Sequence, residues 1–183
     1  MRIMAFVLAV TAGCSSPSTG VENIDRAAQA AALEAALAGE NISDPAALPL
    51  EGTANYAGFM TLNLPTVDGR QANVGDLNLA VDFGATSNQV SGGVSNFSGT
   101  TGTLDISGGD LNRGADPDTD FTFDGALSGT LQTGSTAFDI DGNLLGEFRG
   151  RDQYGLTGIV SGTITGSGSQ DIFDGSMAAT RTD

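Results

Sequence analysis

The chain has 183 residues, 27 of them glycine, and carries 22 acidic against 7 basic residues, which gives a formal net charge of −15. This charge argues against a nucleic-acid partner, because nucleic-acid binding needs a stripe of basic side chains that displaces counterions. The chain has no histidine, no lysine and a single cysteine, so it lacks the groups for Ser-His or Cys-His catalysis and for most zinc sites. We therefore expect no enzyme, no cofactor and no metal site.

The N-terminus predicts a lipoprotein signal peptide over residues 1–13. A charged start and an apolar run too short to span a bilayer precede Ala12-Gly13-Cys14, and small residues before a lone cysteine are typical of bacterial lipoproteins. Cys14 is then the lipidated residue, which carries diacylglyceryl and fatty acyl groups such as palmitate. Thr11 stands where a leucine is usual, and an ordinary signal peptide with an incidental cysteine is the alternative. Ser15, where aspartate would signal inner-membrane retention, favours the outer membrane.

Residues 14–20 form a polar tether, and residues 21–50 are expected to hold a helix and a linker. The alanine-rich segment 21–39 predicts about five turns of helix, ended by Gly39. Its apolar residues are expected on a thin stripe of Ile24, Ala28, Ala31 and Ala35, beside the pair Leu33 and Leu37. Such a helix is a spacer or lies loosely on the following domain, so we expect removal of the chain up to Pro49 to leave that domain folded.

Apolar and polar residues alternate from Gly52 onward, and this period of two predicts strands. Eight such segments at hairpin spacing predict an all-β fold for residues 51–183, an eight-stranded antiparallel up-and-down barrel. Outward faces rich in Asn, Asp, Thr and Ser favour a soluble barrel over a transmembrane one. The expected strands are 53–64, 76–83, 88–97, 101–111, 121–131, 136–150, 156–165 and 172–181.

The clearest alternation lies between Phe138 and Phe148. Phe138, Ile140, Leu144 and Phe148 share one face with Gly142 and Gly146, whereas Asp139, Asp141, Asn143 and Glu147 share the other. Glycine weakens a strand unless a bend or a close approach needs the missing side chain, so these glycines indicate a strongly curved sheet.

Four segments resemble, in order and spacing, the barrel domain of transferrin-binding protein B and related surface lipoproteins: GTANYAG (52–58), LAVDFG (79–84), GNLLGEFRG (142–150) and GIVSG (158–162). The resemblance implies an eight-stranded barrel on an acylated tether, often at the surface of Gram-negative bacteria. It implies a host or environmental protein, or a haem-type ligand, as partner. The large receptors of this family add a handle domain to each barrel, and this chain has a single barrel and no handle, so transferrin binding does not follow.

Two acidic segments partly resemble calcium sites. Asp116, Asp118 and Asp120 alternate as in a calcium loop, but Phe121 stands where an EF-hand needs glycine and Leu127 where it needs glutamate. The acids of segment 139–143 are expected on the outer face of a strand. A solvated surface is therefore the stronger interpretation of both, with calcium at the first loop left open.

The best candidate for partner binding is the loop with Arg149, Arg151 and Tyr154, because Tyr and Arg dominate many protein interfaces and function concentrates on loops of a rigid scaffold. A plain hairpin with incidental charges is the alternative, and the acidic loop 112–120 comes next. Tyr56 is expected to be a core residue. The sequence thus predicts an outer-membrane, lipid-anchored and surface-exposed protein that binds a ligand or a protein. The alternative is a structural lipoprotein that faces the periplasm without a specific ligand.

Overall fold

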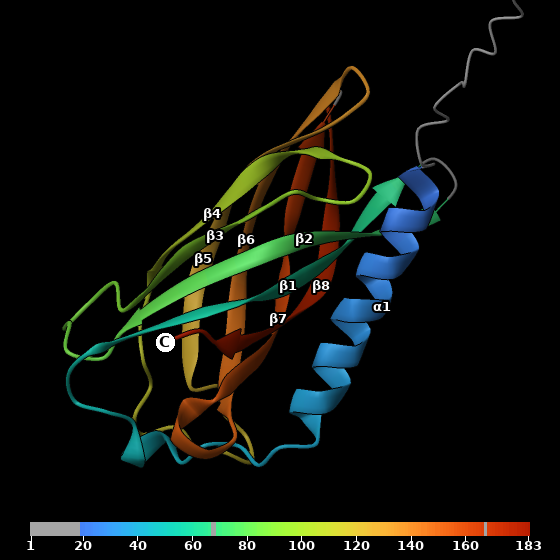
Figure 1. Cartoon of the computed structure of the whole chain (residues 1–183). Helices are drawn as coiled ribbons and strands as arrows, with labels where there is room; N and C mark the ends of the chain where they lie inside the picture. The colour runs from blue at the N-terminus through green and yellow to red at the C-terminus, as the bar shows by residue number, and fades with distance from the viewer. Residues whose placement is uncertain (1–18, 67–68, 167) are drawn as a thin grey trace, which may run out of the picture.

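The structure is a computed structural model that describes residues 19–66, 69–166 and 168–183. Its strands form one closed antiparallel barrel in which each strand pairs with the next and the last pairs with the first (Figure 1). The predicted fold class is confirmed, whereas the signal peptide and Cys14 lie outside the described residues. The strands are β1 (Thr53–Thr66), β2 (Gly69–Asp82), β3 (Val90–Ser95), β4 (Thr101–Gly109), β5 (Phe123–Thr133), β6 (Thr136–Arg149), β7 (Gly155–Gly166) and β8 (Ser169–Arg181).

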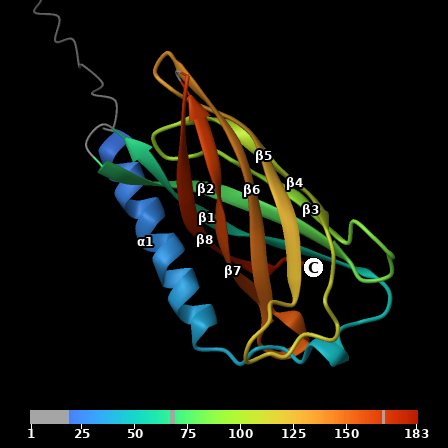
Figure 2. The same ribbon diagram turned by 180° about the vertical axis from the view of Figure 1, so that it is seen from behind.

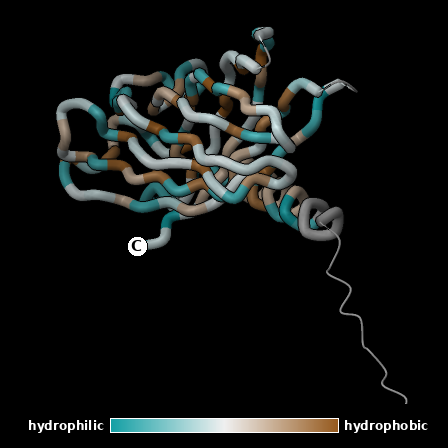
Figure 3. Tube along the Cα trace, turned by 90° about the horizontal axis from the view of Figure 1, so that it is seen from above, coloured by the Kyte–Doolittle hydropathy of each residue, from teal (hydrophilic) through white to brown (hydrophobic). Residues whose placement is uncertain are grey.

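The barrel interior is filled by every second side chain, as the alternation predicts. In β6, Ile140, Leu144 and Phe148 are buried, whereas Asp139 and Asp141 face solvent. Viewed from above, apolar and polar residues succeed one another along the strands (Figure 3). Because one face of each strand lines the core, the register of the barrel is fixed by this pattern.

The inward glycines of β6 make room for aromatic rings. A Cβ on Gly142 would lie 2.8 Å from Cζ of Phe173, and a Cβ on Gly146 would overlap the ring of Phe123. That ring packs against Phe148, with centroids 5.1 Å apart. The glycines therefore serve the close approach that their spacing in the sequence indicates.

The second strand is longer than the sequence predicts. It begins at Gly69, and its residues Arg70 to Val74 pair with Pro65 to Thr61 of β1. The sequence predicts that the first strand ends at residue 64, before Pro65, but β1 continues to Thr66. Strand β8 pairs with β1 only as far as Asn63, so the proline lies past the end of that ladder, where its missing N–H is tolerated.

One helix, α1 (Thr19–Ala38), lies along the outside of the barrel against β8, β1 and β7 (Figures 1 and 2). It ends just before Gly39, as predicted. None of the helices in the described ranges is long and apolar enough to cross a bilayer.

The apolar stripe predicted for α1 is wrong. Ala28, Ala31 and Ala35 are exposed, whereas Ala30 and Leu37 are buried. A Cβ on Gly155 of β7 would overlap Leu37, so the leucine packs directly on the glycine backbone. A large side chain gains more from burial than a methyl group, and Leu37 therefore sets which face of α1 meets the barrel.

Arg26 joins the first half of α1 to the barrel wall. Its guanidinium donates a hydrogen bond to the carbonyl of Asn96 and lies 3.5 Å from the carboxylate of Asp76. Asn96 belongs to the β3–β4 connection, so α1 begins near the end of the barrel at which β1, β3, β5 and β7 end. This end is called the upper end, as it is drawn in Figure 1, and the opposite end the lower end.

The linker after α1 closes the lower end. Ile42 forms a bridge with Arg149, the Ser43 amide donates to the carbonyl of Phe148 at 2.9 Å, and a short 3-10 helix, η1 (Pro45–Ala47), follows. Leu48 is only 3% exposed and belongs to the core of the barrel. Residues 41–49, called the closing segment below, are thus part of the folded domain.

Arg113 holds the closing segment in place. Its guanidinium donates to the carbonyls of Leu48 at 2.8 Å and Pro49 at 2.6 Å, and to that of Phe83 at 2.9 Å. Three carbonyls from two separate segments therefore share one cation, and hydrogen bonds from a charged donor are the stronger kind.

Candidate functional site

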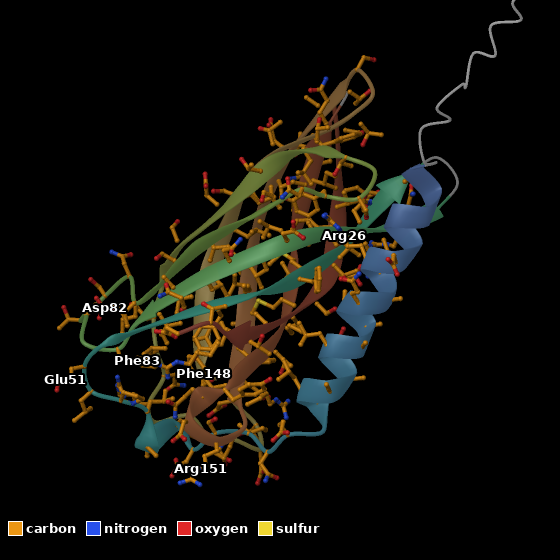
Figure 4. All side chains as sticks on the ribbon, viewed as in Figure 1. Arg26, Glu51, Asp82, Phe83, Phe148 and Arg151 are labelled. Atoms are coloured by element: carbon orange, nitrogen blue, oxygen red, sulfur yellow. The ribbon has the colours of Figure 1, made fainter. Side chains whose placement is uncertain are left out.

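The two loops that the sequence singles out both lie at the lower end of the barrel. The β6–β7 hairpin loop, residues 150–154, contains the 3-10 turn η2 (Arg151–Gln153). The acidic loop, residues 112–120, connects β4 to β5. Arg151 lies at the bottom of the molecule in Figure 4, whereas Arg26 of α1 lies nearer the upper end.

Two of the three predicted binding residues point into solvent from the hairpin loop. The side chain of Arg151 is 94% exposed, and Tyr154 is 54% exposed. Arg151 lies 3.6 Å from the carboxylate of Asp152, but an ion pair this exposed holds its partners weakly. Both side chains are therefore accessible to a partner.

The hairpin loop has a strained backbone. Asp152 and Gln153 adopt φ angles of 58° and 54°, in the left-handed region that residues other than glycine rarely occupy. Such strain persists only where the surrounding structure holds it, and it gathers at functional sites.

Hydrogen bonds from neighbouring strands hold this strained turn. The Tyr56 hydroxyl donates to the carbonyl of Gln153 at 3.0 Å, and the Arg181 amide donates to that of Tyr154 at 2.8 Å. Residues from β1 and β8 thus fix the loop from inside and beside the barrel, and Arg151 and Tyr154 are presented by a rigid turn.

Tyr56 has a role that sequence reasoning missed. It is buried as predicted, at 1% exposure, and burial raises the pKa of its hydroxyl well above the usual value of 10.0. The hydroxyl therefore stays protonated and remains a donor to the loop. A tyrosine in phase with core positions is the available signal, since a buried hydroxyl needs a partner.

Arg149 is placed apart from the other two predicted residues. It is the last residue of β6, and its guanidinium contacts Glu147 at 2.7 Å and the Thr157 hydroxyl at 3.0 Å. It also reaches the carbonyl of Glu40, at 3.4 Å. These contacts tie the outer wall to the end of α1, so Arg149 supports the base of the hairpin loop rather than its exposed surface.

The acidic loop is organised by its own carboxylates. The Asp118 amide donates to Asp116 Oδ1 at 3.0 Å, and the Asp116 amide donates to Asp120 Oδ2 at 3.1 Å. Among the described residues, no three acidic or cysteine side chains come together as a metal site would require. Calcium binding at this loop therefore stays an untested hypothesis.

A hollow of about 530 Å³ lies between the acidic loop and the outer wall. Asp110, Asp120 and Asp124 line it together with Phe121 and Leu145. Asp110 and Asp120 lie at the two ends of the β4–β5 connection and Asp124 lies in β5, and the alternation pattern does not predict that they line one hollow.

No family model, curated protein or solved structure matches this chain. The fold alone does not name a partner, since one architecture serves many functions. The two loops and their position relative to the start of α1 are therefore the features of the barrel that bear on function.

Proposed function

We propose that this chain is a non-enzymatic outer-membrane lipoprotein, anchored through Cys14, that binds a protein or ligand partner with the loops of its lower end. One observation carries the proposal: the start of α1 and the two candidate loops lie at opposite ends of the barrel. Thr19 follows the anchoring residue closely, and α1 has 20 residues, which corresponds to about 30 Å of helix. The helix therefore holds the loops away from the membrane.

The hairpin loop is the proposed contact surface. Tyr154 offers an amphipathic ring, and Arg151 offers a donor fork, on a turn that is fixed by Tyr56 and Arg181. A preorganised turn loses little conformational entropy on binding, so its contacts translate into affinity more fully. Arg149 acts in this scheme by holding the base of the loop through Glu147.

The resemblance to the transferrin-binding protein B barrel supports the same proposal. A single eight-stranded barrel behind a lipidated tether is the arrangement that this resemblance implies. A host or environmental protein, or a haem-type ligand, is accordingly the proposed class of partner.

Anchoring is tested with Cys14→Ser. We expect the variant to leave the membrane fraction and appear in the soluble fraction, and retention at the wild-type level would contradict a lipid anchor.

Surface exposure is tested by protease shaving and antibody labelling of intact cells. Cleavage and labelling that occur only after the outer membrane is opened would favour the alternative, a structural lipoprotein that faces the periplasm.

Partner binding is tested by pull-down with the chain from Ser15 onward, against host or environmental proteins and haem. Tyr154→Ala and Arg151→Ala are each expected to weaken capture about tenfold or more, the scale of an interface hot spot. Arg70→Ala is the matched control, because Arg70 is an exposed arginine at the upper end. A loss below threefold in both variants would mean that the hairpin loop is not the hot spot, and the acidic loop would be tested next.

A further inference from the structure

The upper mouth of the barrel contains a cavity of about 220 Å³. Its apolar wall includes Leu64, Phe138 and Ile164, and its polar wall includes Asn73, Thr100 and Thr136. None of the residues that line it carries a charge. The cavity lies at the end opposite the hairpin loop, so it is separate from the surface proposed above.

Small residues shape this mouth. Phe138 and Gly166 face each other across β6 and β7, and a Cβ on Gly166 would overlap the phenyl ring. The ring therefore packs against the backbone of β7. At the lower end, by contrast, Leu48, Phe83 and Phe148 fill the corresponding space as members of the core.

One residue that lines the cavity has a side-chain oxygen with no hydrogen-bond partner among the residues that the structure describes. It is Oγ1 of Thr100, which is buried. Buried hydroxyl groups in proteins are paired in the great majority of cases, and leaving one unpaired is unfavourable.

An amide group lies on the same wall. Asn73 is only 4% exposed, and its amide nitrogen donates to the carbonyl of Gln71 at 3.1 Å. Its Oδ1 lies 3.2 Å from the place that a Cβ on Gly99 would take, next to Thr100. Two residues that line one cavity thus supply a hydroxyl that can donate or accept and an amide carbonyl that accepts.

We propose that this cavity binds a small neutral molecule with an apolar body and one hydroxyl oxygen, held by Thr100 Oγ1 and Asn73 Oδ1. The size fits, because an engineered cavity of about 150 Å³ takes benzene, whereas drug-sized ligands need about 300 Å³ or more. Neutrality follows from the uncharged lining and from the net charge of −15, which repels anions. A ligand hydroxyl would give Thr100 its missing partner.

The test compares benzyl alcohol with toluene, which has the same ring but no oxygen. Two-dimensional ¹H–¹⁵N spectra of the chain from Ser15 onward are recorded during titration with each compound. We expect saturable shifts at the amides of Asn73 and Thr100 for benzyl alcohol, and an affinity about tenfold higher than for toluene, the scale of one hydrogen bond.

Thr100→Val removes the hydroxyl at constant shape. It is expected to lower the affinity for benzyl alcohol to that for toluene and to leave toluene binding unchanged. Without ligand the variant should melt no lower than the wild type, because it loses an unpaired buried hydroxyl. Thr100→Ser should keep the preference for the alcohol, and Thr103→Val, at an exposed position of β4, should change neither affinity.

Results of three kinds would overturn the proposal. One is the absence of saturable shifts at the mouth with either compound up to about 10 mM, far above the dissociation constant of a specific site. Another is equal affinity for the two compounds in the wild type, which would mean that water satisfies Thr100. The last is an unchanged preference for the alcohol in Thr100→Val, or its loss in Thr100→Ser.

Discussion

Leu48→Ala removes the apolar side chain with which the closing segment enters the lower end of the barrel. Leu48 is 3% exposed and packs in the main core. Replacing a core leucine by alanine destabilises a protein by about 2–5 kcal/mol, depending on how far the site can collapse. Because Leu48 lies at the end of the core, where the segment can move inward, we expect a loss of about 2–3 kcal/mol.

The assay is urea unfolding of the chain from Ser15 onward, followed by circular dichroism. Leu50→Ala is the matched control, since Leu50 is two residues away and 80% exposed, and it should change the free energy of unfolding by less than about 0.5 kcal/mol. A loss below about 1 kcal/mol for Leu48→Ala, or equal losses for both leucines, would refute the packing argument.

Three further changes test the contacts described above by the same assay. Arg113→Met should lower the free energy of unfolding by about 2–3 kcal/mol, because three carbonyls lose a charged donor. An effect below about 0.5 kcal/mol, the size usual for a neutral surface change, would mean that water replaces the guanidinium. Gly146→Ala should lower the free energy of unfolding by about 1–3 kcal/mol, because the added methyl group overlaps the ring of Phe123. An unchanged free energy of unfolding would show that the ring can move aside. Tyr56 holds its proton in the folded state when the unfolded chain has lost it, since its pKa is raised from 10.0, so stability should fall as the pH rises above about 10. Tyr56→Phe should flatten that fall, and an equally steep fall in this variant would assign it to other groups.

The strands could be predicted from the sequence because alternation and glycine spacing are local properties of the chain. Each expected strand is present, and the main differences lie at strand ends such as Gly69, where polar residues at the end of a hairpin hide the alternation. The sequence also indicates the end of α1 correctly, because Gly39 is a local signal.

The closing segment could not be predicted, because its role depends on residues distant in the sequence. Leu48 and Arg113 are 65 positions apart, and nothing local links an arginine in the β4–β5 connection to a proline-rich linker. The expectation that the barrel folds without residues up to Pro49 therefore conflicts with the observed packing. A chain that begins at Glu51 should lose at least as much stability as Leu48→Ala, whereas a chain that begins at Asn41 keeps the closing segment.

The candidate site was predictable in its residue types but not in its geometry. The exposure of Tyr154 and Arg151 could be predicted, because both residues lie in a polar turn between two strands. Two contacts depend on tertiary structure and could not be predicted. They are the ion pair of Arg149 with Glu147 and the hydrogen bond from the Tyr56 hydroxyl to the carbonyl of Gln153.

The seam between β1 and β8 joins the two ends of the barrel sequence. Tyr56 pairs with Arg181, and the Thr182 hydroxyl donates to the carbonyl of Asn55 across 127 positions of the chain. Contacts this distant form late, because a long loop must close before they can stabilise anything. A chain that is synthesised from its N-terminus therefore carries an unpaired β1 edge until β8 has been made. A premature stop that removes β8 alone would leave open edges on both β1 and β7, and open edges invite pairing with other chains.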